Sequence, residues 1–222
     1  MSGAVARSLR EVYRILYKHH GPQRWWPADG PFEVAVGAVL TQNTAWTNVE
    51  RAIANLRDAN CLSPEAIVAL PERRLAELLR PSGYFNVKGR RLRALCEWWL
   101  TRGGLTALAA VRTPALREAL LGVRGVGRET ADDILLYAFG RPVFVVDAYT
   151  RRLFGRLDLI DPQADYDEIR VLLEGHLGRR LTLFNEYHAL VVRHGKDVCR
   201  VRPRCAACPL AAICPGALAA GS

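Results

Sequence analysis

Apolar residues recur at intervals of three or four along most of the chain, which is the spacing of helices that bury one face. Segments rich in glycine or proline separate these runs. The clearest stripes are Val49, Ile53 and Leu56; Leu116, Leu120 and Val123; Ile134, Leu135 and Ala138; Ile169, Leu172, Leu173 and Leu177; and Tyr187, Leu190, Val191 and His194. The one strand-like run, V-F-V-V at 143–146, is too short to found a sheet. The pattern predicts an all-α fold.

The composition is that of a globular protein. Half of the 222 residues are apolar, enough for one large domain or two small ones. No run of about 18 uncharged apolar residues occurs, so we expect no membrane span. The N-terminus lacks the apolar stretch of a secretory signal, which favours a cytoplasmic protein, associated with the nucleoid at most.

The charge balance favours a polyanionic partner. Cationic side chains exceed anionic ones by nine, and all 31 are arginines except Lys18, Lys88 and Lys196. Arginine suits bidentate contacts with phosphate, so nucleic acid is one interpretation. A solvated surface in an arginine-rich proteome would give the same excess. Charge alone leaves both interpretations open.

Four cysteines near the C-terminus predict a metal centre. Cys199, Cys205, Cys208 and Cys214 follow the spacing Cys-x5-Cys-x2-Cys-x5-Cys, and clustered thiols in a cytosolic protein favour metal over disulfides. Zinc is one candidate, but zinc sites usually use two paired CxxC knuckles. One CxxC with longer, unequal arms favours a 4Fe–4S cluster. We expect the other cysteines, Cys61 and Cys96, to be buried apolar residues.

The segment G-V-R-G-V-G-R-E-T-A-D-D, at 122–133, predicts a helix–hairpin–helix motif. Gly125 and Gly127 permit a tight turn and close backbone approach. The amides that follow, near Val126 and Arg128, then suit a DNA phosphate. An ordinary connection within a helical bundle is the alternative.

Asp147 follows this turn by twenty residues, where an apolar run meets a new helix in V-V-D-A-Y-T-R-R-L-F. An aspartate at this position is commonly an N-cap. It is also a candidate for a carboxylate held at the mouth of a cleft. The residues alone leave the choice open.

Together, the hairpin, its glycines, Asp147 and the four-cysteine loop resemble the endonuclease III superfamily of DNA glycosylases. The resemblance extends from about residue 20 to residue 215. Within that superfamily, five stretches look like the 3-methyladenine DNA glycosylase branch. They are R-W-W-P at 24–27, G-A-V-L-T-Q-N-T-A-W-T-N-V at 37–49, R-P-S-G-Y-F-N-V-K at 80–88, G-V-G-R-E-T-A-D at 125–132 and R-H-G-K at 193–196.

The resemblance implies a catalytic role for Asp147. In the family, the matching carboxylate stabilises an oxocarbenium-like sugar cation while water attacks, as in glycoside hydrolysis. Members that also cleave the strand carry a nucleophilic lysine in the hairpin helix, at the position of Glu129 here. A carboxylate cannot form an imine, so the resemblance implies a monofunctional glycosylase with absent or weak lyase activity. Glu129 also suits the first turn of a helix through the helix dipole.

The resemblance also implies how DNA is held while a damaged base is flipped out of the duplex. Gln42 matches the residue that fills the vacated space, Tyr84 matches the wedge, and Lys88 is counted with the DNA-binding residues. The base pocket is expected to comprise Trp25, Trp26, Pro27, Trp46 and Lys196, because aromatic faces stack on bases and attract a cationic, alkylated one. The structural alternatives are an interhelical hydrogen bond for Gln42, a half-buried turn aromatic for Tyr84 and core packing for the tryptophans.

The implied architecture has two helical domains flanking a DNA-binding cleft. Residues 31–140 form a bundle with the hairpin, and residues 1–30 plus 141–222 form a second domain with the cluster loop at 199–214. A monomer bound to damaged double-stranded DNA, with a 4Fe–4S cofactor, is expected. The sequence departs from the family in two ways. Its first cysteine gap is five residues where six is usual, and the methyladenine enzyme with the most similar pocket motifs lacks the four cysteines.

Three functions remain to be separated. The leading hypothesis is a monofunctional glycosylase that excises alkylated purines such as 3-methyladenine in base excision repair. The second is an endonuclease III-like glycosylase for oxidised pyrimidines with weak lyase activity. The third is a non-catalytic binder of lesion DNA, although a pure binder has no need of an ionised acid near the sugar.

Overall fold

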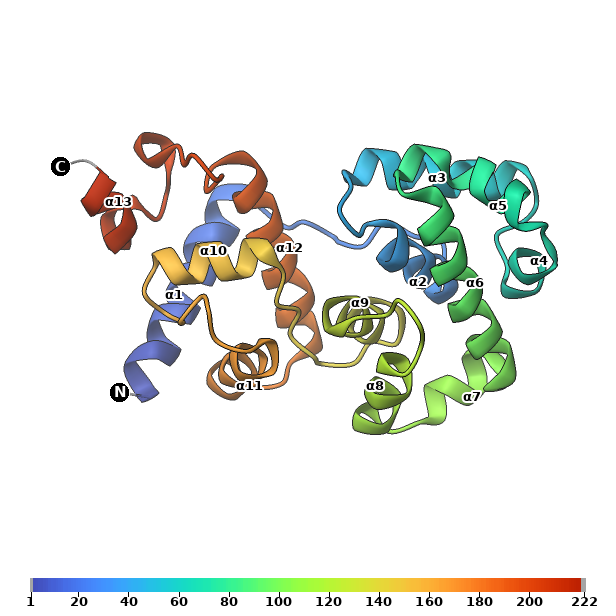
Figure 1. Ribbon diagram of the computed structural model, residues 1–222. Coiled ribbons are helices and arrows are strands. Elements are labelled where there is room, and N and C mark those ends of the chain that lie inside the picture. The colour runs from blue at the N-terminus through green and yellow to red at the C-terminus, as the bar shows by residue number, and fades with distance from the viewer. Residues whose placement is uncertain (1, 221–222) are drawn as a thin grey trace. The chain divides into compact units, whose positions relative to one another are not determined.

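The computed structural model describes residues 2–220, and within that range helices joined by short connections account for all regular structure, with no strand (Figure 1). The all-α prediction is therefore confirmed. The strand-like run at 143–146 is an irregular segment whose four side chains are buried.

The chain divides into two compact units. Unit 1 comprises the described residues up to 27 together with those from 142 onward, and unit 2 comprises residues 28–141. Each unit buries its own set of apolar side chains, as expected for chain segments that fold around separate cores.

Unit 2 contains eight α-helices and two short helical turns of other types. Helix α6 packs against α4 and α5, and α2 packs against the turn that follows α9. The elements are α2 (Pro31–Leu40), α3 (Trp46–Asp58), α4 (Pro64–Ala69), α5 (Glu72–Leu79), η1 (Arg80–Ser82), α6 (Phe85–Thr101), α7 (Gly104–Ala110), α8 (Thr113–Leu121), α9 (Arg128–Asp133) and the π-helix η2 (Ile134–Ala138).

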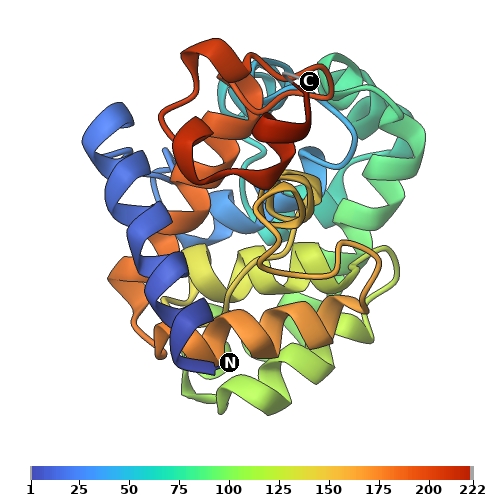
Figure 2. The same cartoon turned by 90° about the vertical axis from the view of Figure 1, so that its left-hand side faces the viewer.

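Unit 1 joins the N-terminal helix to the C-terminal third of the chain. Helix α1 lies beside α12 (Figures 1 and 2), and their contact buries Tyr187, whose hydroxyl donates to the carbonyl of Leu9 at 2.8 Å. The elements are α1 (Ser2–His20), α10 (Ala148–Arg156), α11 (Tyr166–Leu177), α12 (Leu181–Asp197), η3 (Cys205–Ala207), η4 (Ala211–Ile213) and α13 (Pro215–Ala220).

The predicted stripes lie largely in these cores. Two of their members, Ala138 and Leu172, are only half-buried. Cys96 is fully buried as predicted, but Cys61 is half-buried in the turn after α3, where its thiol approaches the carbonyl of Ala59 at 3.1 Å. The prediction for Cys61 was therefore wrong, because the helix ends at Asp58, before the cysteine is reached.

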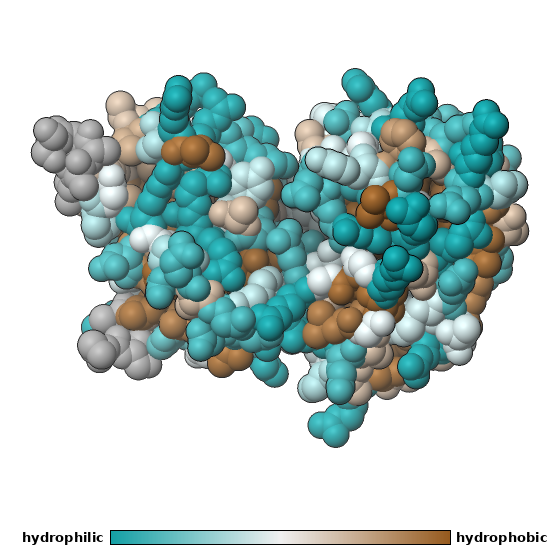
Figure 3. Space-filling view, in the orientation of Figure 1, coloured by the Kyte–Doolittle hydropathy of each residue, from teal (hydrophilic) through white to brown (hydrophobic). Residues whose placement is uncertain are grey.

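Hydrophilic residues cover most of the face shown in Figure 3, over both units. Across residues 2–220, no helix combines the length and the apolar character needed to cross a bilayer.

Candidate functional site

The predicted hairpin is formed by α8, a turn and α9. Gly125 has a φ of +89°, and a Cβ at this position would lie 2.2 Å from Cγ of Arg91, so both backbone and packing require glycine. Gly127 differs, because its φ of −90° suits any residue, and a Cβ there would meet no described atom within 4 Å. It is the N-cap of α9 without a capping side chain. Binding of a DNA phosphate at this helix end stays a prediction.

Gln42 is bonded to the hairpin. Its Nε2 donates to the carbonyl of Gly125 at 3.2 Å and to the hydroxyl of Thr130 at 2.9 Å, while its Oε1 accepts from Arg91. These contacts match the structural alternative, in which Gln42 makes interhelical hydrogen bonds. Arg91 and Thr130, which the sequence did not single out, complete this group.

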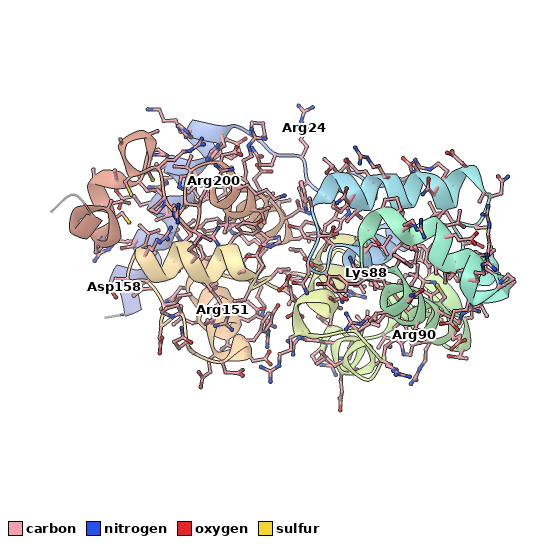
Figure 4. All side chains as sticks on the ribbon, turned by 45° about the horizontal axis from the view of Figure 1, so that its top comes forward. Arg24, Lys88, Arg90, Arg151, Asp158 and Arg200 are labelled. Atoms are coloured by element: carbon pink, nitrogen blue, oxygen red, sulfur yellow. The ribbon has the colours of Figure 1, made fainter. Side chains whose placement is uncertain are left out.

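Tyr84 and Lys88 have very different exposures. Tyr84, the N-cap of α6, has a φ of 46° and is 72% exposed, so its ring is accessible to a partner. Lys88 is 1% exposed, and its Nζ donates to the carbonyls of Leu40 at 2.8 Å and Ser82 at 2.6 Å (Figure 4). Burial, with a smaller effect of Arg91, lowers the pKa of Lys88 to about 8. These contacts correct the expectation that Lys88 binds DNA directly, since its ammonium instead fixes the turn that carries Tyr84.

Glu129 lies in the first turn of α9 and is exposed. Its position suits the helix dipole, as the sequence suggested. Arg128 beside it is also exposed, whereas Val126 is buried in the turn.

Asp147 is the N-cap of α10 in unit 1. Its Oδ1 accepts from the amide of Thr150 at 2.7 Å, and its Oδ2 lies 3.6 Å from Nε2 of His188 on α12. The side chains of Asp147 and His188 are only 11% and 6% exposed. One carboxylate oxygen therefore closes the helix, and the other faces an imidazole.

The pKa of Asp147 is lowered in this setting. Burial raises it, but the interaction with His188 and the amide and hydroxyl of Thr150 together outweigh burial. Asp147 is thus ionised at neutral pH. The sequence did not identify His188, which lies among the buried residues of α12 but outside the stripe of Tyr187, Leu190, Val191 and His194.

The expected base-pocket residues are divided between the units. Trp25 and Trp26 are half-buried in unit 1 with their rings edge to face at 5.8 Å, and Pro27 next to them is exposed. Lys196, at the end of α12, places Nζ 5.8 Å from the centre of the Trp25 ring. Trp46 belongs to unit 2, where it donates to Glu50 at 2.9 Å.

The four C-terminal cysteines line one small cavity of about 20 Å³, together with residues of α10 and α13. Cys199 and Cys214 are buried, and Cys205 and Cys208 are half-buried. Burial raises the pKa of the Cys208 thiol, and the neighbouring thiols of the other three raise it further. Figure 2 shows the loop beside α10, where a guanidinium nitrogen of Arg156 lies 3.3 Å from the sulfur of Cys199.

The donors around this cavity are four thiols, the ligand type that 4Fe–4S clusters and zinc sites both use. Within residues 2–220, no three His, Cys, Asp or Glu side chains converge closely enough to hold one metal ion. In a 4Fe–4S cluster, four thiolates ligate different irons, so thiols around a cavity suit it without meeting at one point. The cluster stays a prediction, which the four thiols lining one cavity support by their chemistry. Arg200, labelled in Figure 4, and the exposed Arg202 and Arg204 lie between the first two cysteines.

Comparison with known proteins places these features in a family. Residues 36–178 match the family described as HhH-GPD superfamily base excision DNA repair protein. A protein of Methanocaldococcus jannaschii named "Putative DNA repair glycosylase" is 46% identical over 209 residues, covering 93% of this chain and 95% of its own. Endonuclease III of Thermotoga maritima is 28% identical over 214 residues, covering 95% and 92%.

Two solved structures are similar to this chain over most of its length. The H. pylori 3-methyladenine DNA glycosylase MagIII bound to 1,N6-ethenoadenine is 31% identical with a TM-score of 0.72, covering 88% of this chain and 97% of its own. A non-covalent endonuclease III–DNA complex has a TM-score of 0.84 at 22% identity, covering 97% and 98%. The second likeness bears on the fold alone.

Proposed function

Since the chain belongs to the HhH-GPD superfamily of base excision DNA repair glycosylases, we propose that it is a monofunctional enzyme that excises alkylated purines such as 3-methyladenine from double-stranded DNA. The observation that carries this proposal is the buried carboxylate of Asp147, which is held by the amide of Thr150, faces His188 and shares unit 1 with Trp25, Trp26 and Lys196.

Asp147 performs the central chemical role. As the bond from C1′ to the base breaks, the sugar gains positive charge, and a fixed carboxylate stabilises that charge while water attacks. The amide of Thr150 holds one carboxylate oxygen. The other oxygen, which faces His188, remains for the sugar and water.

An alkylated purine is the substrate that this setting suits. Such a base carries positive charge and is a good leaving group, so little general acid catalysis is needed. The tryptophan rings offer stacking and cation–π attraction. The 31% identity with a 3-methyladenine glycosylase crystallised with 1,N6-ethenoadenine supports the same substrate class.

Strand cleavage by the hairpin route is absent or weak. Glu129 occupies the position of the nucleophilic lysine of bifunctional relatives, and a carboxylate cannot form an imine. No lysine lies between Lys88 and Lys196 to replace it from the same helix.

Cys199, Cys205, Cys208 and Cys214 would hold the 4Fe–4S cluster. Bound there, the cluster would supply structure by pinning the loop that carries Arg200, Arg202 and Arg204. The exposed arginines suit contacts with the DNA backbone. Broad visible absorbance and iron content near four per chain would identify the cluster, whereas zinc content would contradict it.

A second candidate is an endonuclease III-like glycosylase for oxidised pyrimidines, favoured by relatives named endonuclease III that match over most of the chain at 26–29% identity. The protein would be incubated as a monomer with duplexes carrying 3-methyladenine, thymine glycol or a normal base. Release of methyladenine, with strand breaks only after alkali, is the expected result. Breaks without alkali at thymine glycol would support the second candidate, and tight binding without any excision would indicate a non-catalytic binder.

A further inference from the structure

The chain offers few amines that could react with an aldehyde. Apart from its α-amino group, the only amines are those of Lys18, Lys88 and Lys196. Lys88 is buried in unit 2 with its Nζ bonded to two carbonyls, and Lys18 is exposed on α1. Lys196 is exposed at the end of α12 in the same unit as Asp147.

The packing of α12 on α10 brings Lys196 near Asp147. The helices approach closely at Gly195, where a Cβ would lie 2.5 Å from the ring of Tyr149. Arg152 closes the same contact by donating to the carbonyl of Gly195 at 3.0 Å. Tyr149 is two residues after Asp147, so the last turn of α12 lies against the turn that Asp147 caps.

The electrostatic environment of Lys196 is consistent with its lying near Asp147. Partial burial lowers the pKa of the Lys196 ammonium, and the nearby carboxylates of Asp147 and Asp197 offset only part of that effect. A lysine with a lowered pKa is unprotonated more often and is a better nucleophile. Its Nζ lies 5.8 Å from the centre of the Trp25 ring, at the expected base pocket.

We propose that Lys196 forms a covalent imine with the abasic deoxyribose that base excision leaves behind. The inference rests on the proposed function for the source of that product, since excision at C1′ beside Asp147 yields a sugar whose open form carries an aldehyde at C1′. The Nζ lone pair forms a bond to C1′, the carbonyl oxygen takes up protons and leaves as water, and a carbon–nitrogen double bond remains. Attack by water on the imine returns the lysine and the aldehyde.

We expect the imine to retain the abasic product on the protein and to lead only rarely to strand cleavage. Strand cleavage requires a base to remove a C2′ proton, after which the C3′–O3′ bond breaks with its electron pair on the departing phosphate oxygen. The nearby carboxylate, Asp147, is a poor base for this proton, because one of its oxygens accepts the amide of Thr150 and the other faces Nε2 of His188. We therefore expect imine formation to outpace elimination, which keeps the reactive abasic site attached to the protein.

The test uses the full-length protein and a duplex with a single preformed abasic site, so that it does not depend on base excision. Borohydride reduces any imine to a stable amine, and a denaturing gel then measures the covalent protein–DNA adduct. Lys196→Arg keeps the charge but removes the reactive amine, and Lys18→Arg is the matched control. Melting temperature and abasic-duplex affinity verify that both variants are folded and bind.

The wild type and Lys18→Arg should form the adduct, Lys196→Arg should lose at least about tenfold of it, and mass spectrometry of the wild-type adduct should place the modification on Lys196. No adduct from wild-type protein that binds the duplex, or an adduct on any other amine, would overturn the proposal. Methyladenine release, measured on the same preparations, separates this result from the proposed function. Trapping without excision would refute only the glycosylase, and excision without trapping would refute only the imine.

Discussion

Two helices of this protein begin in opposite ways. The N-cap of helix α9 in unit 2 is Gly127, which has no side chain, and a Cβ built there would meet no described atom within 4 Å. Helix α10 in unit 1 starts at Asp147, whose carboxylate accepts the first-turn amide of Thr150. Both ends present the positive pole of a helix, but only α10 has a carboxylate at its N-cap, whereas the acid of α9, Glu129, is exposed in the first turn.

From this difference we expect the start of α9 to bind DNA and the start of α10 to take part in catalysis. A helix with a glycine N-cap has no capping side chain in the way of an external anion such as a DNA phosphate. A helix that begins at a buried aspartate uses those amides to keep a carboxylate ionised and oriented. The start of α9 suits binding of DNA and the start of α10 suits catalysis, so variants at the two helix ends should affect different properties.

The largest effect is expected at Asp147. Asp147→Asn keeps the size of the side chain but removes the charge that stabilises the sugar cation. Single-turnover excision of 3-methyladenine should fall by at least about 100-fold, the scale of losing one electrostatic stabiliser. DNA affinity, measured by fluorescence anisotropy, should change by less than about threefold. If the excision rate of Asp147→Asn stayed within tenfold of the wild-type rate, Asp147 would not be the catalytic carboxylate.

At the hairpin, Gly125→Ala should act through folding. A left-handed residue in contact with the Arg91 side chain has no room for a Cβ, so unfolding free energy should fall by about 1–3 kcal/mol. Chemical denaturation measures the loss. Unchanged stability would mean that the turn and Arg91 readjust freely.

Gly127→Ala is the matched comparison. Its φ accepts alanine and the space is open, so stability should fall by less than about 1 kcal/mol. A methyl group at the bare N-cap should still hinder a phosphate, and we expect roughly tenfold weaker DNA binding with a shallower salt dependence. Wild-type affinity in this variant would argue that the helix end does not contact DNA.

His188 should give the smallest effect. His188→Leu removes the group that lowers the pKa of Asp147, so the pKa rises and the acidic limb of the excision rate should move to higher pH. The rate at neutral pH should fall only slightly, because the Thr150 hydrogen bonds remain and keep the carboxyl group ionised there. His188→Gln, which can place an amide donor near the same oxygen, should recover part of both changes. An unmoved acidic limb in His188→Leu would show that His188 is only a packing residue.

The sequence predicted those parts of the site that are local. Helical stripes, the glycine hairpin and the aspartate that opens a helix are each defined within a few residues, because one turn or one cap sets them. Contacts between residues far apart in the sequence could not be predicted from such local patterns. Gln42 meets Gly125 across 83 positions, and Arg91 meets Gln42 across 49.

Lys88 and His188 illustrate the remaining limit. A lysine within a motif suggests an exposed phosphate contact, yet Lys88 is buried because the carbonyls of Leu40 and Ser82 compensate its ammonium. A histidine among apolar residues of a helix suggests core packing, yet His188 faces Asp147, a residue from another helix. In both cases the partner, not the spacing, determines the role.

The most direct test measures two quantities on the same two variants. Saturated single-turnover excision rate and DNA dissociation constant would be determined for Asp147→Asn and Gly127→Ala alongside the wild type. We expect Asp147→Asn to lose the rate and keep the affinity, and Gly127→Ala to lose affinity and keep the rate at saturation. If rate and affinity fell together in both variants, the two helix ends would not divide binding from chemistry, and the account would be contradicted.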